Sequence, residues 1–395
     1  MSNAFDIIVL GLGAMGSASV FQLAKKGKRV LGIDQFRPPH TLGSSHGDTR
    51  VIRQAIGEGE EYVPLVLRSY ELWREIENAT GLKLLETVGG LIMGRASSSA
   101  AFHGSEDFLQ TTISSAKKFG IAHSLWDANQ IRSRFPQFNL IGDEYGYYEP
   151  EMGFLRPELA IDAQLTLAQT HGAEIRMNER VLEVLPDSSE VRIRTAGTEY
   201  TTEQVVISAG AWLPKLLGPD LAKHFEVSRQ VLFWFGAGGG IEQFLPGRFP
   251  VFIWKFSGEL DDFIYGIPAI DRPSGGIKLG TEQHVVQTTA DAVDRTVSNE
   301  EAREFYDKHV RNRLPGLSSQ CVKATACLYT STRDSGFIID FHPVHRNMLI
   351  VSPCSGHGFK HSAAIGEIVS DLMTSGQSRI NTDKFKWSRL AGCDR

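Results

Sequence analysis

Three glycines and one aspartate near the start of the sequence have the types and spacing of a nucleotide site. Gly11, Gly13 and Gly16 follow an apolar run that ends at Leu10, and Asp34 closes a second apolar run. In such a unit the glycines permit a tight turn, the approach of a pyrophosphate and close packing of the following helix. The Asp34 carboxylate is placed to bind a ribose 2′-hydroxyl, which disfavours a 2′-phosphate. This pattern predicts a dinucleotide site and leaves NAD and FAD both open.

A second glycine-rich segment lies near the other end of the chain. Residues 356–360 read Gly-His-Gly-Phe-Lys and open a predicted helix. A helix start carries free N–H groups and partial positive charge, so this segment is a candidate second anion site. FAD is long and has two polar ends, so it can use both sites. The late helix, with Arg50 and Lys360, would then stabilise the anion that forms on a reduced flavin.

Hydrophobic periodicity predicts the elements that position these residues. Helices are expected at residues 14–26, with Gly27 as the C-cap, at 63–80, and after 356–360. A polar loop at residues 43–50 is suited to wrap a ligand, and residues 97–105 form a low-complexity connection. Strands of the first domain are expected at residues 5–10, 29–33, 174–177, 181–185, 191–194, 205–208, 337–340 and 348–352.

The middle of the sequence has a different pattern. Strands at residues 231–235, 249–255, 263–267 and 277–280, separated by glycine-rich turns, predict a mainly antiparallel sheet. The expected fold is therefore α/β, with a Rossmann-type FAD-binding domain of the glutathione-reductase-like βαβ kind interleaved with a substrate domain on that sheet. The predicted FAD-binding domain comprises residues 1–85, 150–220 and 320–395, and the substrate-binding domain comprises 86–149 and 221–319.

Composition limits the possible partners. The 395 residues exceed what one core usually supports, and 41 Lys plus Arg face 46 Asp plus Glu without a basic block, so we expect no nucleic acid. No apolar run is long enough to cross a bilayer and a core strand starts almost at once, so we expect a cytoplasmic protein without a membrane partner. The four cysteines are Cys321, Cys327, Cys354 and Cys393. They suit neither a disulfide framework nor a metal site, so no metal is expected.

From about residue 5 to 375 the sequence resembles the monomeric sarcosine oxidase and N-methyltryptophan oxidase family of amine-oxidising flavoproteins. The likeness rests on several separate motifs, namely Gly43 to Arg53 with the turn at 57–60, Tyr265-Gly266 with 278–280, 327–329 with 337–340, and 355–360.

The resemblance implies FAD, bound covalently by a thioether from Cys327 to the 8-methyl carbon of the flavin. A buried structural cysteine is the alternative for Cys327, and Cys321 is its near competitor. The residues expected to bind the cofactor are Gly11, Gly13, Met15, Gly16, Asp34, Ser44, His46, Thr49, Arg50, Val181, Gly210, Trp212, Cys327, Gly356, Gly358, Phe359 and Lys360.

The resemblance also implies which residues handle substrate and oxygen. Arg53 and Lys360 would bind the substrate carboxylate, although a structural salt bridge is the alternative for Arg53. Lys278 would hold a water over the flavin and stabilise developing superoxide; without the resemblance, a lone lysine in a strand would be expected to face solvent.

Further roles complete the expected site. Arg50 and His357 join Lys278 as catalytic candidates, with His46 and His357 expected to position groups by hydrogen bonds more than to exchange protons. Tyr265 and Tyr329 would line the substrate cavity, although core packing is the default for an aromatic residue in a strand.

Glu282 departs from the family pattern, because sarcosine oxidases carry a histidine at that position. A glutamate near the amine would favour a cationic group, so Glu282 is a candidate substrate-binding residue and the substrate is expected to differ from sarcosine or to be bulkier. Cys354 likewise replaces a common aromatic residue.

We therefore expect an FAD-dependent oxidase that converts an N-methyl α-amino acid to an imine, with O2 reduced to H2O2. Water would hydrolyse the imine to the primary amine and formaldehyde. Alternatives are an oxidase of cyclic secondary or primary L-amino acids, a flavin amine dehydrogenase with a non-oxygen acceptor, and a flavin-binding subunit whose catalytic partner is another chain. The expected partners are the small-molecule amine and O2, and the chain is expected to be a monomer.

Overall fold

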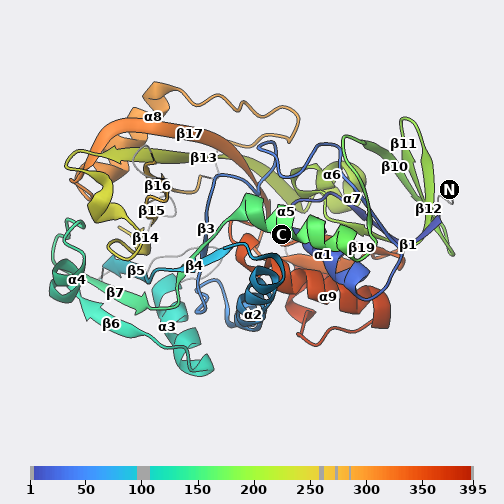
Figure 1. The fold of residues 1–395 in the computed structure, drawn as a ribbon, viewed down its shortest axis with the longest axis horizontal. Coiled ribbons are helices and arrows are strands. Elements are labelled where there is room, and N and C mark those ends of the chain that lie inside the picture. The colour runs from blue at the N-terminus through green and yellow to red at the C-terminus, as the bar shows by residue number, and fades with distance from the viewer. Residues whose placement is uncertain (1–3, 96–106, 258–261, 272–274, 284–285, 393–395) are drawn as a thin grey trace.

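The computed structural model describes residues 4–95, 107–257, 262–271, 275–283 and 286–392. It contains two large β-sheets, one toward the right of Figure 1 and one toward the left, with helices packed beside and between them. The predicted connection at 97–105 and Cys393 lie outside the described residues.

The first sheet has a parallel centre, as the βαβ pattern predicts. β1 (Ala4–Leu10) pairs in parallel with β2 (Val30–Ile33) and β12 (Glu199–Ile207). β2 pairs with β9 (Glu174–Arg176), and β12 pairs with β19 (Met348–Ser352), both in parallel. The last four residues of β1 and all residues of β2 are buried, because helices and strands cover both faces.

Three antiparallel strands extend this sheet. β10 (Val181–Pro186) pairs with β11 (Val191–Thr195), which pairs with the start of β12, and β18 (Ile338–Phe341) pairs with β19. The N-terminal and C-terminal parts of the chain therefore meet in one sheet. Because β1, β12 and β19 run parallel, the early and late glycine-rich segments follow strands whose carboxyl ends lie on the same side of the sheet.

Helix α1 (Ala14–Lys25) packs against α5 (Pro157–Thr170) and α9 (Ser362–Ser375). The crossing of α1 and α9 is close, since a Cβ atom on Gly366 would lie 2.6 Å from the backbone of Ala18. Only glycine permits this approach without a shift of one helix.

Two of the predicted helices match closely and the third begins later than expected. α1 is one residue shorter than predicted, and α2 (Val63–Thr80) has the predicted bounds, ending where Gly81 adopts a left-handed conformation. The late helix does not open at residue 356: a 3-10 turn, η5 (Phe359–His361), precedes α9.

The second sheet is mainly antiparallel, as predicted, and among its described strands only the β14–β5 pairing is parallel. Its order is β17-β13-β16-β15-β14-β5-β7-β6. The strands are β5 (Gly90–Arg95), β6 (Ser124–Asp127), β7 (Glu144–Glu149), β13 (Phe225–Ala237), β14 (Val251–Lys255), β15 (Phe263–Ile267), β16 (Ile277–Gly280) and β17 (Leu317–Thr332).

The long β13–β17 ribbon runs from the left side of Figure 1 toward the first sheet. A small third sheet has the spatial strand order β3-β8-β4, formed by β3 (Arg50–Ile52), β8 (Gly153–Leu155) and β4 (Leu85–Thr87). The strands of the second sheet come from residues 90–149 and 225–332, while the exact domain boundaries stay a prediction.

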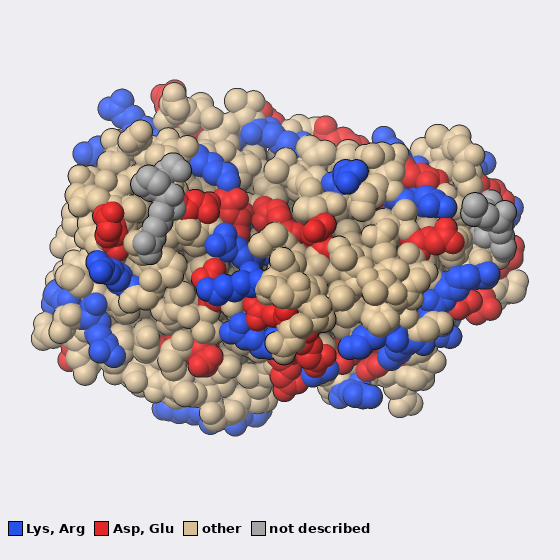
Figure 2. Space-filling view, in the orientation of Figure 1, with Lys and Arg blue, Asp and Glu red and all other residues tan. Residues whose placement is uncertain are grey.

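The remaining elements are helical, and the face shown in Figure 2 is mixed in charge. Basic and acidic side chains are interspersed over the face shown in Figure 2. Among the described residues, no helix combines the length and apolarity that a membrane span requires. The other helices are α3 (Phe108–Phe119), α4 (Ala128–Arg134), α6 (Leu213–Leu216), α7 (Pro219–Ala222), α8 (Asn299–Phe305), η1 (Glu60–Tyr62), η2 (Gly210–Trp212), η3 (Ile241–Phe244), η4 (Tyr306–Val310), η6 (Asp383–Phe385) and η7 (Trp387–Gly392).

Candidate functional site

A cavity of about 360 Å³ is lined by residues of both large sheets, so the site lies where the two sheets meet. It contains both glycine-rich segments. Of the predicted site residues, those that line it are Gly11, Gly13, Met15, Asp34, Ser44, Thr49, Arg50, Arg53, Val181, Gly210, Trp212, Tyr265, Lys278, Glu282, Cys327, Tyr329, Gly356, His357, Gly358, Phe359 and Lys360. Gly16 and His46 are absent from the lining.

The backbone forms one end of the cavity. Gly11 has a φ of +85°, and a Cβ atom there would lie 2.7 Å from the carbonyl oxygen of Ser208. A Cβ atom on Gly16 would lie 1.7 Å from the carbonyl oxygen of Gly11, so Gly16 serves helix packing and not the lining. Gly13 precedes α1 without a side-chain cap, which leaves N–H groups of the first turn available to an anion.

Asp34 braces this turn. Its Oδ2 accepts a hydrogen bond from the Leu12 N–H at 2.7 Å, and its Oδ1 accepts one from the Phe36 N–H at 2.8 Å. Burial raises the pKa of Asp34, and the two backbone bonds oppose that rise. Each carboxylate oxygen has a second lone pair, so Asp34 can still accept a hydrogen bond from a ligand hydroxyl.

The end of β12 supplies a second open backbone segment. Gly210 has a φ of +53°, and nothing lies within 4 Å of the position that its Cβ atom would occupy. Trp212 follows, and its Nε1 donates to Oδ1 of Asp291 at 2.7 Å. Val181, at the start of β10, lines the same end of the cavity. These residues form a wall with space for a ligand beside it.

Lys278 and Arg50 donate hydrogen bonds to backbone carbonyl oxygens of the polar loop at residues 43–50. Nζ of Lys278 donates to the carbonyl oxygens of Gly47 at 2.8 Å and Thr49 at 2.6 Å. Arg50 donates to the carbonyl oxygen of Ser44 at 2.8 Å. Burial, with Arg50 nearby, holds the pKa of Lys278 well below its usual range. Lys278 is therefore a buried amine, not a solvent-facing edge lysine.

Cys327 lies at this loop and Cys321 does not. The Cys327 side chain is buried in β17, with Sγ 3.5 Å from the carbonyl oxygen of Ser44 and 3.8 Å from Nη2 of Arg50. Cys321 is half-buried on the same strand, contacts its own neighbour Lys323, and is absent from the cavity lining. Of the two, only Cys327 can reach a group in the cavity.

His46 is a buried residue of this loop. Among the described residues, neither of its ring nitrogens has a hydrogen-bond partner. Burial, followed by the charges of Arg50 and Lys278, lowers the pKa of His46 to about 3. His46 is therefore neutral at physiological pH, which agrees with a packing or hydrogen-bonding role and disfavours acid-base work.

The other end of the cavity is built from buried charges. Arg53 forms a buried ion pair with Glu58, and its guanidinium lies 5.2 Å from the centre of the Phe108 ring. Nζ of Lys360 and Nδ1 of His357 each lie 3.8 Å from Oε1 of Glu58. One carboxylate is thus shared by Arg53, Lys360 and His357.

Lys360 is tuned by this environment. Its Nζ donates to the carbonyl oxygen of His357 at 2.6 Å, and burial lowers its pKa to about 7 although Glu58 acts in the opposite direction. An additional anion bound beside it would favour the charged form. Arg53 and Lys360 can therefore receive a ligand carboxylate, which would share them with Glu58.

Tyr265, Tyr329 and Glu282 also line the cavity. The Glu282 side chain is buried. Burial raises the pKa of Tyr265 and of Tyr329, so both hydroxyls stay protonated. These three residues therefore offer hydroxyl groups and one carboxylate to a polar, cationic part of a ligand.

Glu58 is the functional residue that sequence reasoning did not identify. It lies in the turn at 57–60 that carried part of the family resemblance, five positions after Arg53. An acid so close to a predicted carboxylate-binding arginine was the available signal. Whether the two side chains meet depends on the turn, in which Gly59 has a φ of +158°.

Comparison with known proteins agrees with this geometry. The family described as FAD dependent oxidoreductase matches residues 6–372. The chain is 39% identical to a monomeric sarcosine oxidase from Streptomyces avermitilis over 99% of both chains. It is 34% identical to an N-methyl-L-tryptophan oxidase from Salmonella heidelberg, with 98% of this chain and 99% of that protein covered.

Solved structures show the same fold at lower identity. NikD, an unusual amino acid oxidase essential for nikkomycin biosynthesis, superposes with a TM-score of 0.82 at 22% identity and covers 97% of both chains. The L-proline dehydrogenase from P. horikoshii gives a TM-score of 0.80 at 21% identity, with 98% and 97% covered. The chain belongs to the FAD-dependent oxidoreductase family, and the predicted fold class and family resemblance are confirmed.

Proposed function

We propose that this member of the FAD-dependent oxidoreductase family oxidises the secondary amine of an N-methyl α-amino acid and passes the electrons to O2. The observation that carries the proposal is one cavity that joins a backbone-built nucleotide end to a buried end lined by Arg53 and Lys360. The relatives named above act on N-methylated amino acids according to their names, which supports the same class of substrate.

The residues at the nucleotide end fit FAD. The uncapped start of α1 after Gly13 offers N–H groups to a pyrophosphate, and Asp34 keeps acceptor capacity for a ribose hydroxyl. Open space faces Gly210. When bound, FAD supplies the two-electron redox chemistry that no side chain provides.

Arg53 and Lys360 would bind the substrate carboxylate. Both are buried, so their charge–charge interactions are screened less than those of a surface pair. Glu58 balances them while no substrate is bound, and a substrate carboxylate would add a second anion to the same two cations. The α-carbon and its amine would then face the other polar lining residues, Tyr265, Tyr329 and Glu282.

Glu282 would select the amine or side chain. A buried carboxylate favours a cationic group, so we propose a substrate that is larger than sarcosine or carries an additional positive charge. The amine itself must be neutral when it loses its hydride equivalent, and the resulting imine is hydrolysed by water to formaldehyde and the primary amine.

Lys278 would promote the reaction with oxygen. A preorganised N–H donor in a buried site stabilises negative charge that develops on oxygen far better than a solvated lysine does. Its two carbonyl contacts fix its position, and Arg50 lies near enough to influence its pKa.

Cys327 would attach the cofactor covalently. Its Sγ lies in the cavity beside Arg50 and the carbonyl oxygen of Ser44. In acid-precipitated protein, the yellow colour should stay in the pellet for the wild type and move to the supernatant for Cys327→Ser. Cys321→Ser is the matched control and should keep the colour in the pellet. A colourless wild-type pellet contradicts the covalent bond.

The proposed activity is tested with a panel of N-methyl, cyclic and primary amino acids supplied to the purified holoenzyme. We expect one peroxide per substrate consumed, with the highest kcat/KM for an N-methyl amino acid other than sarcosine. Substrate consumption without peroxide, but with reduction of an added quinone, would assign a dehydrogenase. A highest kcat/KM for a cyclic or primary amino acid would assign that alternative instead.

A further inference from the structure

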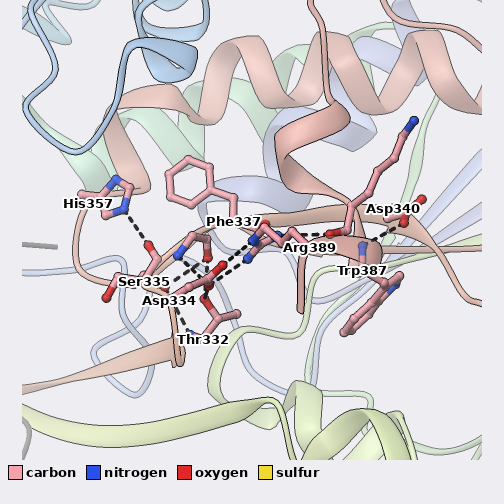
Figure 3. Close-up of polar contacts among 11 residues, drawn as sticks. Thr332, Asp334, Ser335, Phe337, Asp340, His357, Trp387 and Arg389 are labelled. Atoms are coloured by element: carbon pink, nitrogen blue, oxygen red, sulfur yellow. Dashed lines mark hydrogen bonds and ion pairs between the residues drawn. The ribbon is translucent and has the colours of Figure 1, made fainter. Parts of the chain in front are cut away.

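Arg389, near the C-terminus, contacts the turn between β17 and β18. Arg389, in η7, forms a two-pronged ion pair with Asp334: Nε donates to Oδ2 at 2.7 Å and Nη2 donates to Oδ1 at 3.2 Å (Figure 3). Nη1 donates to the carbonyl oxygen of Phe337. Gly336 permits this approach, because a Cβ atom there would lie 2.9 Å from Nε of Arg389.

Asp334 in turn holds the tight turn between β17 and β18. Its Oδ1 accepts from the Gly336 N–H at 3.1 Å and lies 2.7 Å from Oγ1 of Thr332. Burial acts to raise the pKa of Asp334, but the hydrogen bonds from Arg389 and Thr332 outweigh it and lower the pKa. Ser335 has a φ of +56°, a conformation that side chains rarely adopt without such support.

This turn presents its backbone to His357. The carbonyl oxygen of Ser335 lies 3.1 Å from Nε2 of His357 (Figure 3), and a carbonyl only accepts, so Nε2 carries the hydrogen. The imidazole stacks on Phe337 at 4.6 Å and meets the edge of Tyr62 at 5.1 Å. Its other nitrogen, Nδ1, lies toward Glu58.

We propose that Arg389 is a positioning residue that fixes the ring orientation and tautomer of His357, and through it the carboxylate-binding cluster of Glu58, Arg53 and Lys360. The inference rests on the proposed function, because it assigns the substrate carboxylate to that cluster. His357 connects the two regions at two points: its ring faces Glu58, and its carbonyl oxygen accepts from Nζ of Lys360.

Loss of the Arg389 side chain would allow the turn between β17 and β18 to move, and the His357 ring could then rotate. With Nε2 no longer held by Ser335, the imidazole could place its hydrogen on Nδ1 and donate to Glu58. Glu58 would then be less available to Arg53 and Lys360, and both cations would lose their fixed positions. The expected cost falls on substrate binding, because Lys278 is held by the carbonyl oxygens of Gly47 and Thr49, which lie outside this cluster.

The test compares Arg389→Gln and Arg389→Lys with Arg229→Gln in the holoenzyme. Arg229 is a matched control, since its side chain is equally exposed, at 16%, and forms a two-pronged pair with Glu301 away from the cavity lining. ¹⁵N-histidine NMR reads the tautomer of His357, whose signal is identified by its loss in His357→Asn. Steady-state kinetics with an N-methyl amino acid reads KM and kcat separately.

We expect the wild type and Arg229→Gln to show the Nε2–H tautomer. Arg389→Gln should show exchange between tautomers and a KM raised roughly tenfold, with kcat within about twofold of wild type, as the loss of a charge-assisted hydrogen bond implies. Arg389→Lys should partly restore the Nε2–H tautomer and the wild-type KM. An unchanged His357 signal and KM in Arg389→Gln, with only a lowered melting temperature, would overturn the proposal and leave Arg389 a structural brace.

Asp334→Asn is the second variant if Arg389→Gln does not fold, and it carries the same two expectations. The NMR measurement needs no substrate. An absence of turnover in the wild type would therefore contradict the proposed function, while the tautomer comparison would still decide the role of Arg389.

Discussion

The two ends of the cavity are built in opposite ways. The nucleotide end is formed mainly by backbone at Gly11, Gly13 and Gly210. One carboxylate, Asp34, stabilises its turn by a hydrogen bond. The substrate end is formed mainly by buried ionised side chains such as Arg53 and Glu58. The first end depends on space and backbone conformation, whereas the second depends on charge balance, so different substitutions should disable them.

The largest effect should come from a Cβ atom at the nucleotide end. In Gly16→Ala the new atom would lie 1.7 Å from the carbonyl oxygen of Gly11, which forces α1 away from β1. We expect the free energy of unfolding to fall by roughly 3 kcal/mol or more and the flavin content to drop strongly. Thermal melting and the flavin-to-protein absorbance ratio measure both.

Gly197→Ala is the matched control, because nothing lies within 4 Å of its Cβ position. It should behave as wild type. A Gly16→Ala protein with normal flavin content and stability would remove the packing argument for this end.

The next largest effect should appear in Lys278→Met. Loss of the buried amine should slow reoxidation by O2 by roughly 10²–10³-fold, while anaerobic reduction by substrate changes little. Stopped-flow measurement of the two half-reactions checks this. Lys323→Met is the control: Lys323 lies 4.6 Å from the ring centre of Trp234, over which Lys278 also lies, but it is partly exposed. Equal slowing of both half-reactions would refute the role in oxygen reduction.

A smaller effect is expected in the pH dependence of carboxylate binding at the substrate end. The pKa of Lys360 is lowered to about 7, so its charge is present below pH 7 and is lost as the pH rises through 7. Binding of propionate, a carboxylate without an amine, should therefore weaken by up to about tenfold per pH unit above pH 7. Titration of the flavin absorbance measures it.

Lys360→Arg keeps its charge over this range and should bind propionate almost independently of pH. A wild-type affinity that stays constant from pH 6 to 9 would contradict the assignment of the carboxylate to Lys360.

The smallest effect concerns substrate choice. Glu282→Gln removes a buried negative charge from the wall of the cavity while keeping its shape. The preference for an N-methyl amino acid with a cationic side chain over a neutral one should fall by roughly tenfold. Competition between the two substrates gives the ratio directly, and an unchanged ratio would place Glu282 outside substrate recognition.

The same contrast explains what the sequence could predict. The β1–α1–β2 unit and α2 follow local rules of periodicity, glycine placement and capping, and both were predicted closely. The partners of Arg53 and His357 depend on tertiary contacts instead. Glu58 meets Arg53 across a turn, and Arg389 reaches the His357 turn from the far end of the chain. Side-chain pairs of this kind leave no periodic signal.

The late helix shows the same limit on a smaller scale. Its apolar spacing was visible, but its start was not, because Gly356 has a φ of +80° and the chain passes through a turn before η5 and α9. That turn places His357 and Lys360 beside Glu58, so the deviation from a regular helix is what forms the substrate end.

Anaerobic mixing of the holoenzyme with N-methyl amino acids tests the central claim most directly. The two-ended cavity predicts that an N-methyl amino acid bleaches the visible flavin absorbance fully, and that Arg53→Met raises the concentration needed by at least about tenfold. Admission of O2 should restore the absorbance and yield one peroxide per flavin. A flavin that stays oxidised with every N-methyl amino acid, or one that is bleached equally well by methylamines without a carboxylate, would contradict the account.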